Sequence, residues 1–415
     1  MRILMVANGA YPDEIGGAHV YVYELARSLA GRGHEAVILT RRIHPGLPRE
    51  ELVGGVRFVR YAYRDVRNPI LWRLNLYRAA RRGFAALARR ERFDVLHAHW
   101  PYSAAGAFSV PAAAPALRVY TMHSPSFEEE LIEAAECRLG KRLTLRELAK
   151  RLWMPLSLAE KKHRESRVLR QCSIIFVLSE FMKKRAIGFF DLPEERLRVI
   201  PGGVDVHRFR PDGPRDDVRR RLGVAAGAQL LFTVRRLVPR MGLKNLLRAV
   251  AIVREAVPRV LLCVGGSGVL GGELDALIGR LGLRDHVRLL GHLPAETLPD
   301  WYRAADYCVM PTEFLEGFGI ASVESMACGT PVLATPVGGN VEVLGGIDPG
   351  LLFSGTSPEE MAEGIIRHLR SGSGEALRER VARHVRERYT WESIARRIED
   401  VLLEQLESQG ARGAA

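Results

Sequence analysis

Two glutamates flank a stretch of bare backbone in residues 313–329, EFLEGFGIASVESMACG, with Glu316 eight positions before Glu324. The preceding run predicts a strand and the following run predicts a helix beginning near Gly319, whose free N–H groups point at the glycine loop. Because glycine lets the backbone approach a ligand closely, such a loop suits a phosphate. The order of acid, phosphate site and acid suits a nucleotide joined to a sugar, although an ordinary loop with two solvated acids also fits the spacing. The residues that we expect to contact such a ligand are Glu316, Gly317, Phe318, Gly319, Ile320 and Glu324.

Short apolar runs alternate with amphipathic stretches along the whole chain. The first set of runs predicts strands at 2–7, 35–40, 56–61, 94–99, 117–122, 174–179 and 197–201, and the second set at 230–234, 260–265, 287–291, 307–311, 331–335 and 350–353. Alternation of strands and helices predicts mostly parallel sheets with helices on both faces. Two successive sets therefore predict two doubly wound α/β domains. Ligands of such sheets bind beyond the carboxyl ends of the strands, so we expect ligand-binding residues directly after the strands.

The chain has 415 residues, more than one hydrophobic core usually serves, and it has no apolar run of membrane-spanning length. The Gly-, Pro- and charge-rich stretch within 202–228 is the expected domain boundary. The five cysteines are scattered and form no CxxC pair. This usage predicts reduced thiols in the cytoplasm, with no metal site and no disulfide framework. The opening MRILMVANGAYP has too short an apolar run for a signal peptide and predicts a buried first strand.

The formal net charge is +13, and only seven of the 61 basic residues are lysines. Such an excess is typical of proteins that bind nucleic acid, anionic lipid or phosphorylated ligands, but an arginine-rich bias spread over solvated helices gives the same count. No RNP-like, zinc-finger or KH motif occurs, which argues against nucleic acid. Residues 139–170 predict a basic amphipathic helix, in which Thr144 and Glu147 form a capping box and Leu145, Leu148 and Leu152 share one face. Such a helix either contacts an anionic membrane peripherally or packs its leucines inward.

A second glycine loop, CVGGSGVLGGE, contains Gly266, Gly268 and Gly271 in the G-x-G-x-x-G spacing after a predicted strand. A nicotinamide dinucleotide site also needs an acid at the end of the next strand. That strand ends at Gly291 and His292 instead, which counts against a nicotinamide cofactor. An NAD-dependent oxidoreductase remains an alternative function on this evidence.

The motif E-G-F-G-I-x-x-x-E-x-M-A-x-G-T-P-V resembles the E-x7-E motif of retaining glycosyltransferases of family four, which have the GT-B fold. Further segments follow in the family's order: the glycine loop near residue 16, DVLHAHW, YTMHSP, IIFVLSEFMKK, VIPGGVDVHRFRP and FTVRRLVPRMGLKNLLRAV. The resemblance covers nearly the whole chain. It implies two Rossmann-like domains facing a cleft, with an acceptor-side domain at 1–205 and a donor-binding domain at 206–388. It also implies that the helix at 391–409 packs back on the first domain.

The resemblance also implies roles for individual residues. His123, Arg236 and Glu316 would be the catalytic residues: His123 beside the donor sugar, Arg236 on the leaving diphosphate and Glu316 on sugar hydroxyls. The family usually has R-L-x-x-x-K-G, but this chain has Met241 at the lysine position, so Lys244, Arg235 or Arg240 are the alternatives for the second cation. The remaining donor-side candidates are Gly17, Gly266, His292 and Leu293, and the acceptor-side candidates are Gly16, His19 and His99.

The expected function is transfer of a sugar, with retained anomeric configuration, from a UDP- or GDP-sugar to a hydroxyl acceptor. The acceptor would be a sugar, a glycolipid or a small molecule. We expect neither metal nor cofactor, because cationic side chains and the helix dipole can stabilise the leaving diphosphate. A basic nucleic-acid or membrane-surface binding protein with a non-catalytic fold is the second alternative. We expect a cytoplasmic location, with peripheral membrane contact as a candidate interaction.

Overall fold

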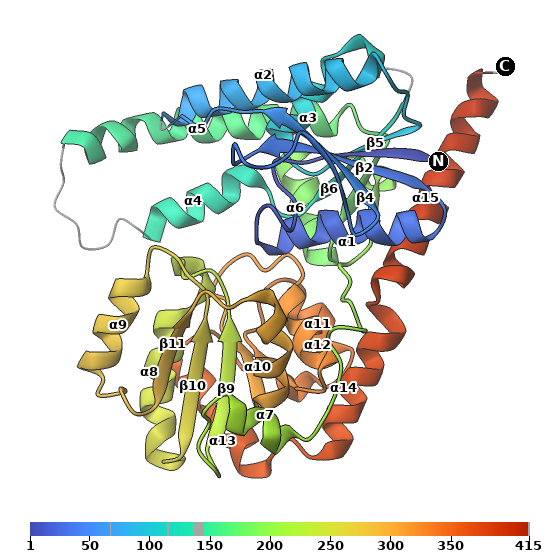
Figure 1. Ribbon diagram of the computed structural model, residues 1–415. Coiled ribbons are helices and arrows are strands. Elements are labelled where there is room, and N and C mark those ends of the chain that lie inside the picture. Colours follow the sequence, from blue (N-terminus) through green and yellow to red (C-terminus); the bar gives the residue numbers. More distant parts are fainter. Residues whose placement is uncertain (67, 114–115, 137–144, 414–415) are drawn as a thin grey trace. The chain divides into compact units, whose positions relative to one another are not determined.

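The computed structural model describes residues 1–66, 68–113, 116–136 and 145–413 (Figure 1). The expected capping box at Thr144 and leucine face at 145–152, together with Cys137, lie outside the described residues and side chains. The chain divides into two compact units. The first consists of Met1–Glu130, Arg142–Gly202 and Trp391–Ala415, and the second of Leu131–Lys141 and Gly203–Thr390. No helix in the described part is long and apolar enough to cross a membrane.

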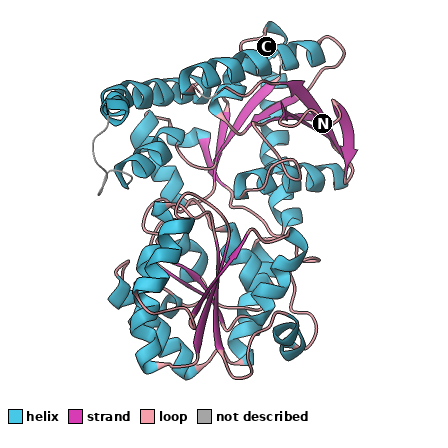
Figure 2. Ribbon diagram, turned by 60° about the vertical axis from the view of Figure 1, so that its left-hand side comes forward, coloured by secondary structure: helices cyan, strands magenta, loops and turns pink. Residues whose placement is uncertain are grey.

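The first unit is built on an eight-stranded sheet in the order β3-β4-β2-β1-β5-β6-β7-β8. Its strands are β1 (Arg2–Val6), β2 (Glu35–Arg42), β3 (Glu50–Val53), β4 (Val56–Ala62), β5 (Val95–Ala98), β6 (Leu117–Met122), β7 (Ile174–Val177) and β8 (Leu197–Val199). All neighbours pair in parallel except β3 with β4. The central strands are mostly apolar and buried because helices cover both faces, as Figure 2 shows.

The helices along this part of the chain are α1 (Gly17–Gly31), α2 (Pro69–Ala88), η1 (Pro111–Ala113), α3 (Pro101–Phe108), α4 (Ser126–Glu136), α5 (Leu145–Leu169), α6 (Glu180–Phe190), η2 (Glu194–Arg196) and α15 (Trp391–Gly413). The last of these, α15, packs against α1. Its Glu399 carboxylate accepts a hydrogen bond from Arg32 and contacts His34 Nε2 at 2.7 Å. These contacts tie the end of the chain to its beginning.

The second unit is built on a five-stranded parallel sheet in the order β11-β10-β9-β12-β13. Its strands are β9 (Gln229–Val234), β10 (Val260–Gly265), β11 (Val287–Gly291), β12 (Tyr307–Met310) and β13 (Val332–Ala334). Its helices are α7 (Arg215–Arg221), η3 (Pro239–Met241), α8 (Leu243–Ala256), α9 (Gly271–Arg280), η4 (Ala295–Thr297), α10 (Leu298–Ala304), α11 (Ile320–Ala327), α12 (Gly339–Gly345), η5 (Pro349–Leu351), α13 (Pro358–Ser371) and α14 (Glu375–Arg388). The predicted pair of doubly wound α/β sheets is confirmed.

Two strand predictions were wrong. Residues 350–353 do not form a strand: Gly350 and Leu351 belong to η5, and Leu352 makes an isolated bridge to Ala334. Pro349 and the side chain of Asp348, which accepts from Gly350 N at 2.9 Å, favour a tight turn there. The strand β3 was not predicted, because its residues are largely exposed and half of them are charged, without the apolar run that is typical of a buried strand.

Candidate active site

The carboxyl ends of β9 and β12 lie side by side in the second unit. From β9 the chain winds outward through β10 and β11, then returns to the other side of β9 as β12 and β13. In a doubly wound sheet, ligands bind where the winding reverses in this way. The residues that follow β9 and β12 are therefore the first place to look for a ligand site, and Arg235, Thr312 and Glu316 are among them.

Arg235 and Glu316 form a buried ion pair at this point. The Arg235 guanidinium donates through Nη2 to the Glu316 carboxylate and through Nη1 to Thr312 Oγ1 at 2.6 Å. Thr312 Oγ1 itself donates to Glu316 Oε2 at 2.8 Å. The Arg235 and Glu316 side chains are only 6% and 12% exposed. Burial alone would raise the pKa of Glu316, but the Arg235 charge and the two hydrogen bonds lower it below its ordinary value. Glu316 is therefore a carboxylate at neutral pH.

The glycine loop leads directly into α11, as the sequence predicts. Gly319 is the residue before the helix and adopts φ of 90°, a conformation that favours glycine. A Cβ atom at Gly319 would lie 3.1 Å from Ser322 Oγ and 3.4 Å from Asn340 Oδ1. Both side chains are fully buried, and neither of these atoms has a hydrogen-bond partner in the part of the chain that the structure describes. The helix start is thus surrounded by polar groups that a bound ligand could satisfy.

Glu324 lies one turn into α11 and is anchored from a neighbouring helix. The hydroxyl of Tyr302, on α10, donates to Glu324 Oε2 at 2.9 Å. Tyr302 is fully buried, and burial together with the Glu324 charge raises its pKa well above the ordinary value. The phenol therefore stays protonated and fixes the direction of the carboxylate.

The second glycine loop packs on the end of β9. A Cβ atom at Gly266 would lie 1.9 Å from the carbonyl oxygen of Arg235, and one at Gly268 would lie 2.5 Å from that of Leu237. Gly266 and Gly268 allow two backbone segments to touch, which accounts for the first two glycines of the motif without a dinucleotide. Leu293 packs against Gly265 on the same side, whereas His292 is exposed.

The predicted cations do not all lie beside Glu316. Lys244 Nζ pairs with Glu273 Oε2 at 2.6 Å, and both side chains are well exposed. They line a separate hollow of about 310 Å³ with Arg248 and Arg280. Arg236 is exposed, and its side chain makes no hydrogen bond or ion pair among the described residues. Arg235, which the sequence reading treated only as an alternative, is the arginine that contacts Glu316.

In the first unit the winding of the sheet reverses between β1 and β5. His99 and Trp100 follow β5, and His123 follows the adjacent β6. His99 Nδ1 lies 3.3 Å from His123 Nε2, and the two rings stack with centroids 5.5 Å apart. His19, on α1, stacks on Trp100 at 5.3 Å. The structure thus brings the acceptor-side candidates His19 and His99 together with His123, which was expected beside the donor sugar.

His97, His99 and His123 are electrically neutral at neutral pH. Burial lowers the pKa of His97, on β5, to about 3, and burial lowers the pKa of His99 well below its ordinary value. Burial and the neighbouring imidazoles likewise lower the pKa of His123 to about 3. His97 Nε2 lies 2.7 Å from Thr121 Oγ1, which orients the ring inside the sheet. At neutral pH the cluster offers uncharged hydrogen-bonding groups rather than cations.

The loop between β1 and α1 carries further polar atoms. Gly16 precedes α1 and Gly17 is its first residue. Glu14 Oε1 accepts from Arg41 at 2.5 Å, while Glu14 Oε2 and Asn8 Oδ1 are enclosed and have no hydrogen-bond partner among the described residues. Both are acceptor atoms, so they suit a ligand that donates hydrogen bonds through hydroxyl groups.

The sequence did not predict that Glu165 of this unit would be a buried carboxyl group. Glu165, on α5, is fully buried and accepts hydrogen bonds from Ser126 N at 3.0 Å and Ser126 Oγ at 2.8 Å. Ser126 begins α4, three positions after His123. Burial raises the pKa of Glu165 to about 7 despite these hydrogen bonds. Its position in a charged stretch of α5 gave no signal that it would turn inward.

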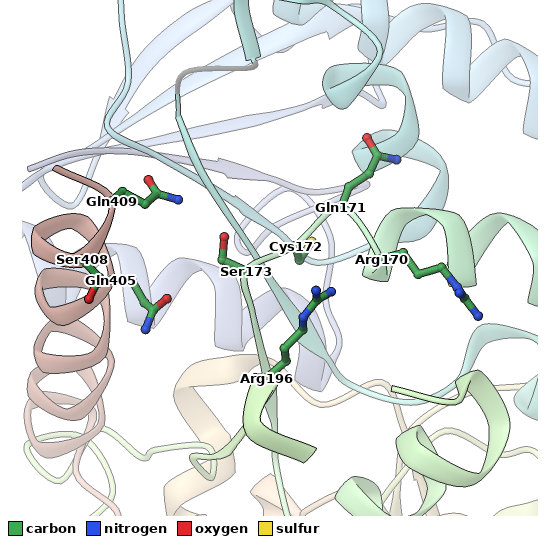
Figure 3. A pocket seen from close by; sticks show the side chains of 8 residues that line it. All are labelled: Arg170, Gln171, Cys172, Ser173, Arg196, Gln405, Ser408 and Gln409. Atoms are coloured by element: carbon green, nitrogen blue, oxygen red, sulfur yellow. The ribbon is translucent and has the colours of Figure 1, made fainter. Parts of the chain in front are cut away.

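A polar cavity of about 350 Å³ lies elsewhere in the first unit (Figure 3). Its lining comes from the segments that precede β7 and β8 and from the last turns of α15: Arg170, Gln171, Cys172, Ser173, Arg196, Gln405, Ser408 and Gln409. It therefore lies at the amino ends of the strands, at the opposite edge from the histidines. Among the described residues, His, Cys, Asp and Glu form no group of three that could hold a metal ion.

Comparisons with known proteins identify the family of the chain. The profile described as "Glycosyltransferase Family 4" matches residues 15–208, and that described as "Glycosyl transferases group 1" matches residues 214–388. The chain is 32% identical to D-inositol 3-phosphate glycosyltransferase of Thermobispora bispora over 95% of this chain and 91% of the relative. It is 27% identical to an uncharacterized glycosyltransferase of Methanocaldococcus jannaschii, covering 99% of this chain and all of the relative.

Solved structures show the same fold at low sequence identity. Sucrose-phosphate synthase from Thermosynechococcus elongatus superposes with a TM-score of 0.76 at 20% identity, over 98% of this chain and 99% of the other. Anabaena HepE in complex with UDP and glucose superposes with a TM-score of 0.71 at 19% identity, over 96% and 98% of the two chains. The chain thus belongs to glycosyltransferase family 4, the group 1 glycosyl transferases, a family of retaining enzymes with the GT-B fold.

Proposed function

We propose that this enzyme transfers a sugar from a UDP- or GDP-sugar bound to its second unit onto a hydroxyl acceptor bound to its first unit. The observation that carries the proposal is the charged cluster at the carboxyl ends of β9 and β12, directly before the start of α11. A helix start supplies backbone N–H groups and a positive partial charge for a diphosphate. The flanking Glu316 and Glu324 supply acceptors for sugar and ribose hydroxyls.

In the proposed mechanism the bond between the anomeric carbon and the diphosphate oxygen breaks first. The sugar becomes oxocarbenium-like, and the acceptor oxygen forms a bond on the face that the diphosphate has left. The acceptor proton passes to an oxygen of the departing diphosphate, so no side chain needs to act as a base. Arg236 and the N–H groups at the start of α11 stabilise the growing negative charge. His123 orients a sugar hydroxyl through its neutral imidazole.

For the acceptor we propose a polyol, because two enclosed atoms in the loop before α1 are hydrogen-bond acceptors without a partner among the described residues. Asn8 Oδ1 and Glu14 Oε2 lie in the loop between β1 and α1, close to His19. The relative from Thermobispora bispora is named for an inositol phosphate, which makes D-inositol 3-phosphate the first acceptor to test. Gly16, Gly17 and His99 complete the proposed acceptor side.

Peripheral contact with a membrane is a further part of the proposal. Trp153 and Leu156 on α5 are 44% and 59% exposed, and Leu71 on the adjacent α2 is 54% exposed. Arg73 of α2 donates to Ser157 Oγ of α5 at 2.8 Å, so the two helices lie together. Exposed aromatic and aliphatic side chains on a helix are typical of helices that lie on a lipid surface. The enzyme would then act in the cytoplasm, at or near the inner face of the membrane.

The decisive experiment is a thermal-shift screen of UDP-, GDP-, ADP- and dTDP-sugars, followed by a transfer assay with D-inositol 3-phosphate and other polyols. A donor present at 100 times its Kd should raise the stability of the folded protein by about 2.7 kcal/mol. Stabilisation by NAD(H) and by none of the nucleotide sugars would favour an oxidoreductase. Salt-sensitive binding to DNA or anionic vesicles, without donor hydrolysis or transfer, would favour a non-catalytic surface-binding protein.

A further inference from the structure

Arg235 is a buried arginine, unlike the solvated arginines at the surface of the second unit. It follows β9 directly, its side chain is only 6% exposed, and its guanidinium points across to the loop that follows β12. Thr312, Glu316 and the Met310 sulfur, 3.6 Å from Nη1, surround it. Burying an arginine is costly unless charge and hydrogen bonds compensate for its lost hydration. A carboxylate and a hydroxyl therefore hold this cation at the point where a ligand is expected.

The pair is held from both sides by the backbone. Arg235 N donates to Gly265 O at 3.0 Å, and Gly266 leaves room for the Arg235 carbonyl. On the other side, Glu313 N donates to Arg240 O at 2.9 Å and Arg240 Nη1 donates to Leu315 O at 3.0 Å. Leu315 has φ of 56°, a strained conformation for a residue with a side chain. Arg240 thus stabilises the loop before Glu316, because its Nη1 group donates to a backbone carbonyl of that loop.

The other basic residues nearby are placed differently. Met241 contributes a buried, uncharged side chain where the R-L-x-x-x-K-G pattern has lysine, and Lys244 pairs with Glu273 in a separate hollow. Arg235 in turn stands where the G-R-L segment has glycine. The chain has therefore lost a cation at 241 and gained one at 235. A guanidinium has five N–H groups, and the contacts of Nη1 with Thr312 and Met310 and of Nη2 with Glu316 leave Nε–H and one N–H of Nη2 for a ligand.

We infer that Arg235 is the second cation of the donor site and replaces the lysine that is absent at Met241. Resting on the proposed function, this inference assigns the Arg235 guanidinium to the terminal phosphate of the nucleoside diphosphate, next to the bond that breaks. Glu316 and Thr312 orient the guanidinium before the donor binds, so little reorganisation is needed when charge develops on the leaving group. Arginine suits this task because it can donate two parallel hydrogen bonds to a phosphate.

The test compares Arg235→Met with the double variant Arg235→Met/Met241→Lys, which moves a cation from 235 to 241. Binding of UDP and UMP, or of GDP and GMP if the donor screen selects guanine, is measured by calorimetry. Arg235→Met should weaken the diphosphate about 10- to 100-fold and the monophosphate less than about threefold, because only the diphosphate has the contacted group. Its turnover with the selected donor should fall about 100-fold. The double variant should recover at least tenfold of that loss.

Arg284→Met is the matched control, because Arg284 is an exposed arginine of the same unit that pairs with Asp275. It should change neither binding nor turnover. Arg235→Lys, which keeps a charge opposite Glu316, serves if Arg235→Met does not fold, and should still lower turnover about tenfold because the bidentate contact is lost. The inference would be overturned if Arg235→Met kept turnover and diphosphate affinity within threefold of wild type. Equal losses of affinity for the monophosphate and the diphosphate would overturn it as well. Either outcome would leave the proposed function intact. A wild-type protein that binds no nucleotide sugar would instead refute the proposed function.

Discussion

The winding of the strands reverses in both sheets, but the chemistry at the two carboxyl edges differs. In the first unit the strands end in stacked, neutral imidazoles and aromatic rings around His99 and His123. In the second unit they end in a buried ion pair, glycine loops and the start of α11. The comparison teaches that the fold supplies only the position of a site, where the winding of the sheet reverses. The residues placed there decide whether the site offers uncharged imidazoles or a buried cation beside a helix start.

The largest effect is expected at Glu316. Glu316→Gln should lower turnover about 10²- to 10³-fold, because the carboxylate both orients Arg235 and accepts from the sugar. It should also destabilise the second unit by about 3 kcal/mol, since a buried cation loses its partner. Steady-state kinetics with the selected donor and thermal unfolding check both effects. Near-normal transfer by the variant would remove Glu316 from the site.

Arg236→Ala separates catalysis from stability in the same unit. Arg236 is exposed, so its loss should change the free energy of unfolding by no more than about 0.5 kcal/mol. Turnover should nevertheless fall about 100-fold if the guanidinium stabilises the leaving diphosphate. Kinetics and thermal unfolding on one protein preparation give both numbers. Unchanged kinetics would remove Arg236 from the proposed mechanism.

Gly266→Ala tests whether the second glycine loop positions Arg235. The added Cβ atom would lie 1.9 Å from the Arg235 carbonyl oxygen, so one backbone segment must move. We expect turnover to fall about 10- to 100-fold, since small displacements of a catalytic group are costly. Gly223→Ala is the control: Gly223 also has positive φ, at 66°, but nothing lies within 4 Å of its Cβ position. Equal losses of turnover in the two variants would contradict the positioning role.

The neutral histidines of the first unit predict a dependence of stability on pH. The folded-state pKa of His97 is about 3, below the unfolded value near 6.5, so the unfolded chain binds more protons between these values. Stability is therefore fully present above about pH 6.5 and falls as the pH drops through this window, by up to about 1.4 kcal/mol per pH unit for each such histidine. His97→Gln should reduce the slope between pH 6 and 5 by about this amount.

Hydrogen-exchange mass spectrometry of peptides from β5 and β7, measured at several pH values, checks this slope. The matched variant in the second unit is His368→Gln. His368 is only partly buried, and burial lowers its pKa while a contact of 2.8 Å with Gly350 O opposes the shift. Its replacement should change the slope less. A larger change for His368→Gln than for His97→Gln would refute the contrast between the units.

The smallest effect is expected at Glu165, whose behaviour should be opposite to that of Glu316. Because its folded-state pKa is raised to about 7, its contribution to stability is present below its unfolded pKa and is lost as the pH rises toward 7 and above. Glu165→Gln should therefore stabilise the first unit by about 1 kcal/mol at pH 8 and be nearly neutral at pH 5. Denaturant unfolding at the two pH values measures this difference, and destabilisation at pH 8 would contradict it.

The fold and half of the candidate site could be predicted from local patterns. Apolar runs alternating with amphipathic stretches identified nearly all the strands, since strands buried on both faces must be apolar. The start of α11 after Gly319 followed from glycine and helix chemistry alone. The strand β3 could not be found in this way, because an exposed edge strand needs no apolar face.

The sequence by itself determined which segments carry candidate functional residues. These are the E-x7-E loop, the glycine loops and the histidines that follow β5 and β6. Only the tertiary structure decided which side chains meet. Arg235 contacts Glu316 because β9 lies beside β12, two strands separated by more than 70 positions in the chain, whereas Lys244 turns toward Glu273 on a neighbouring helix. Burial likewise decided the charge states of His97 and Glu165, because lost hydration depends on what packs around a group and not on its neighbours in sequence.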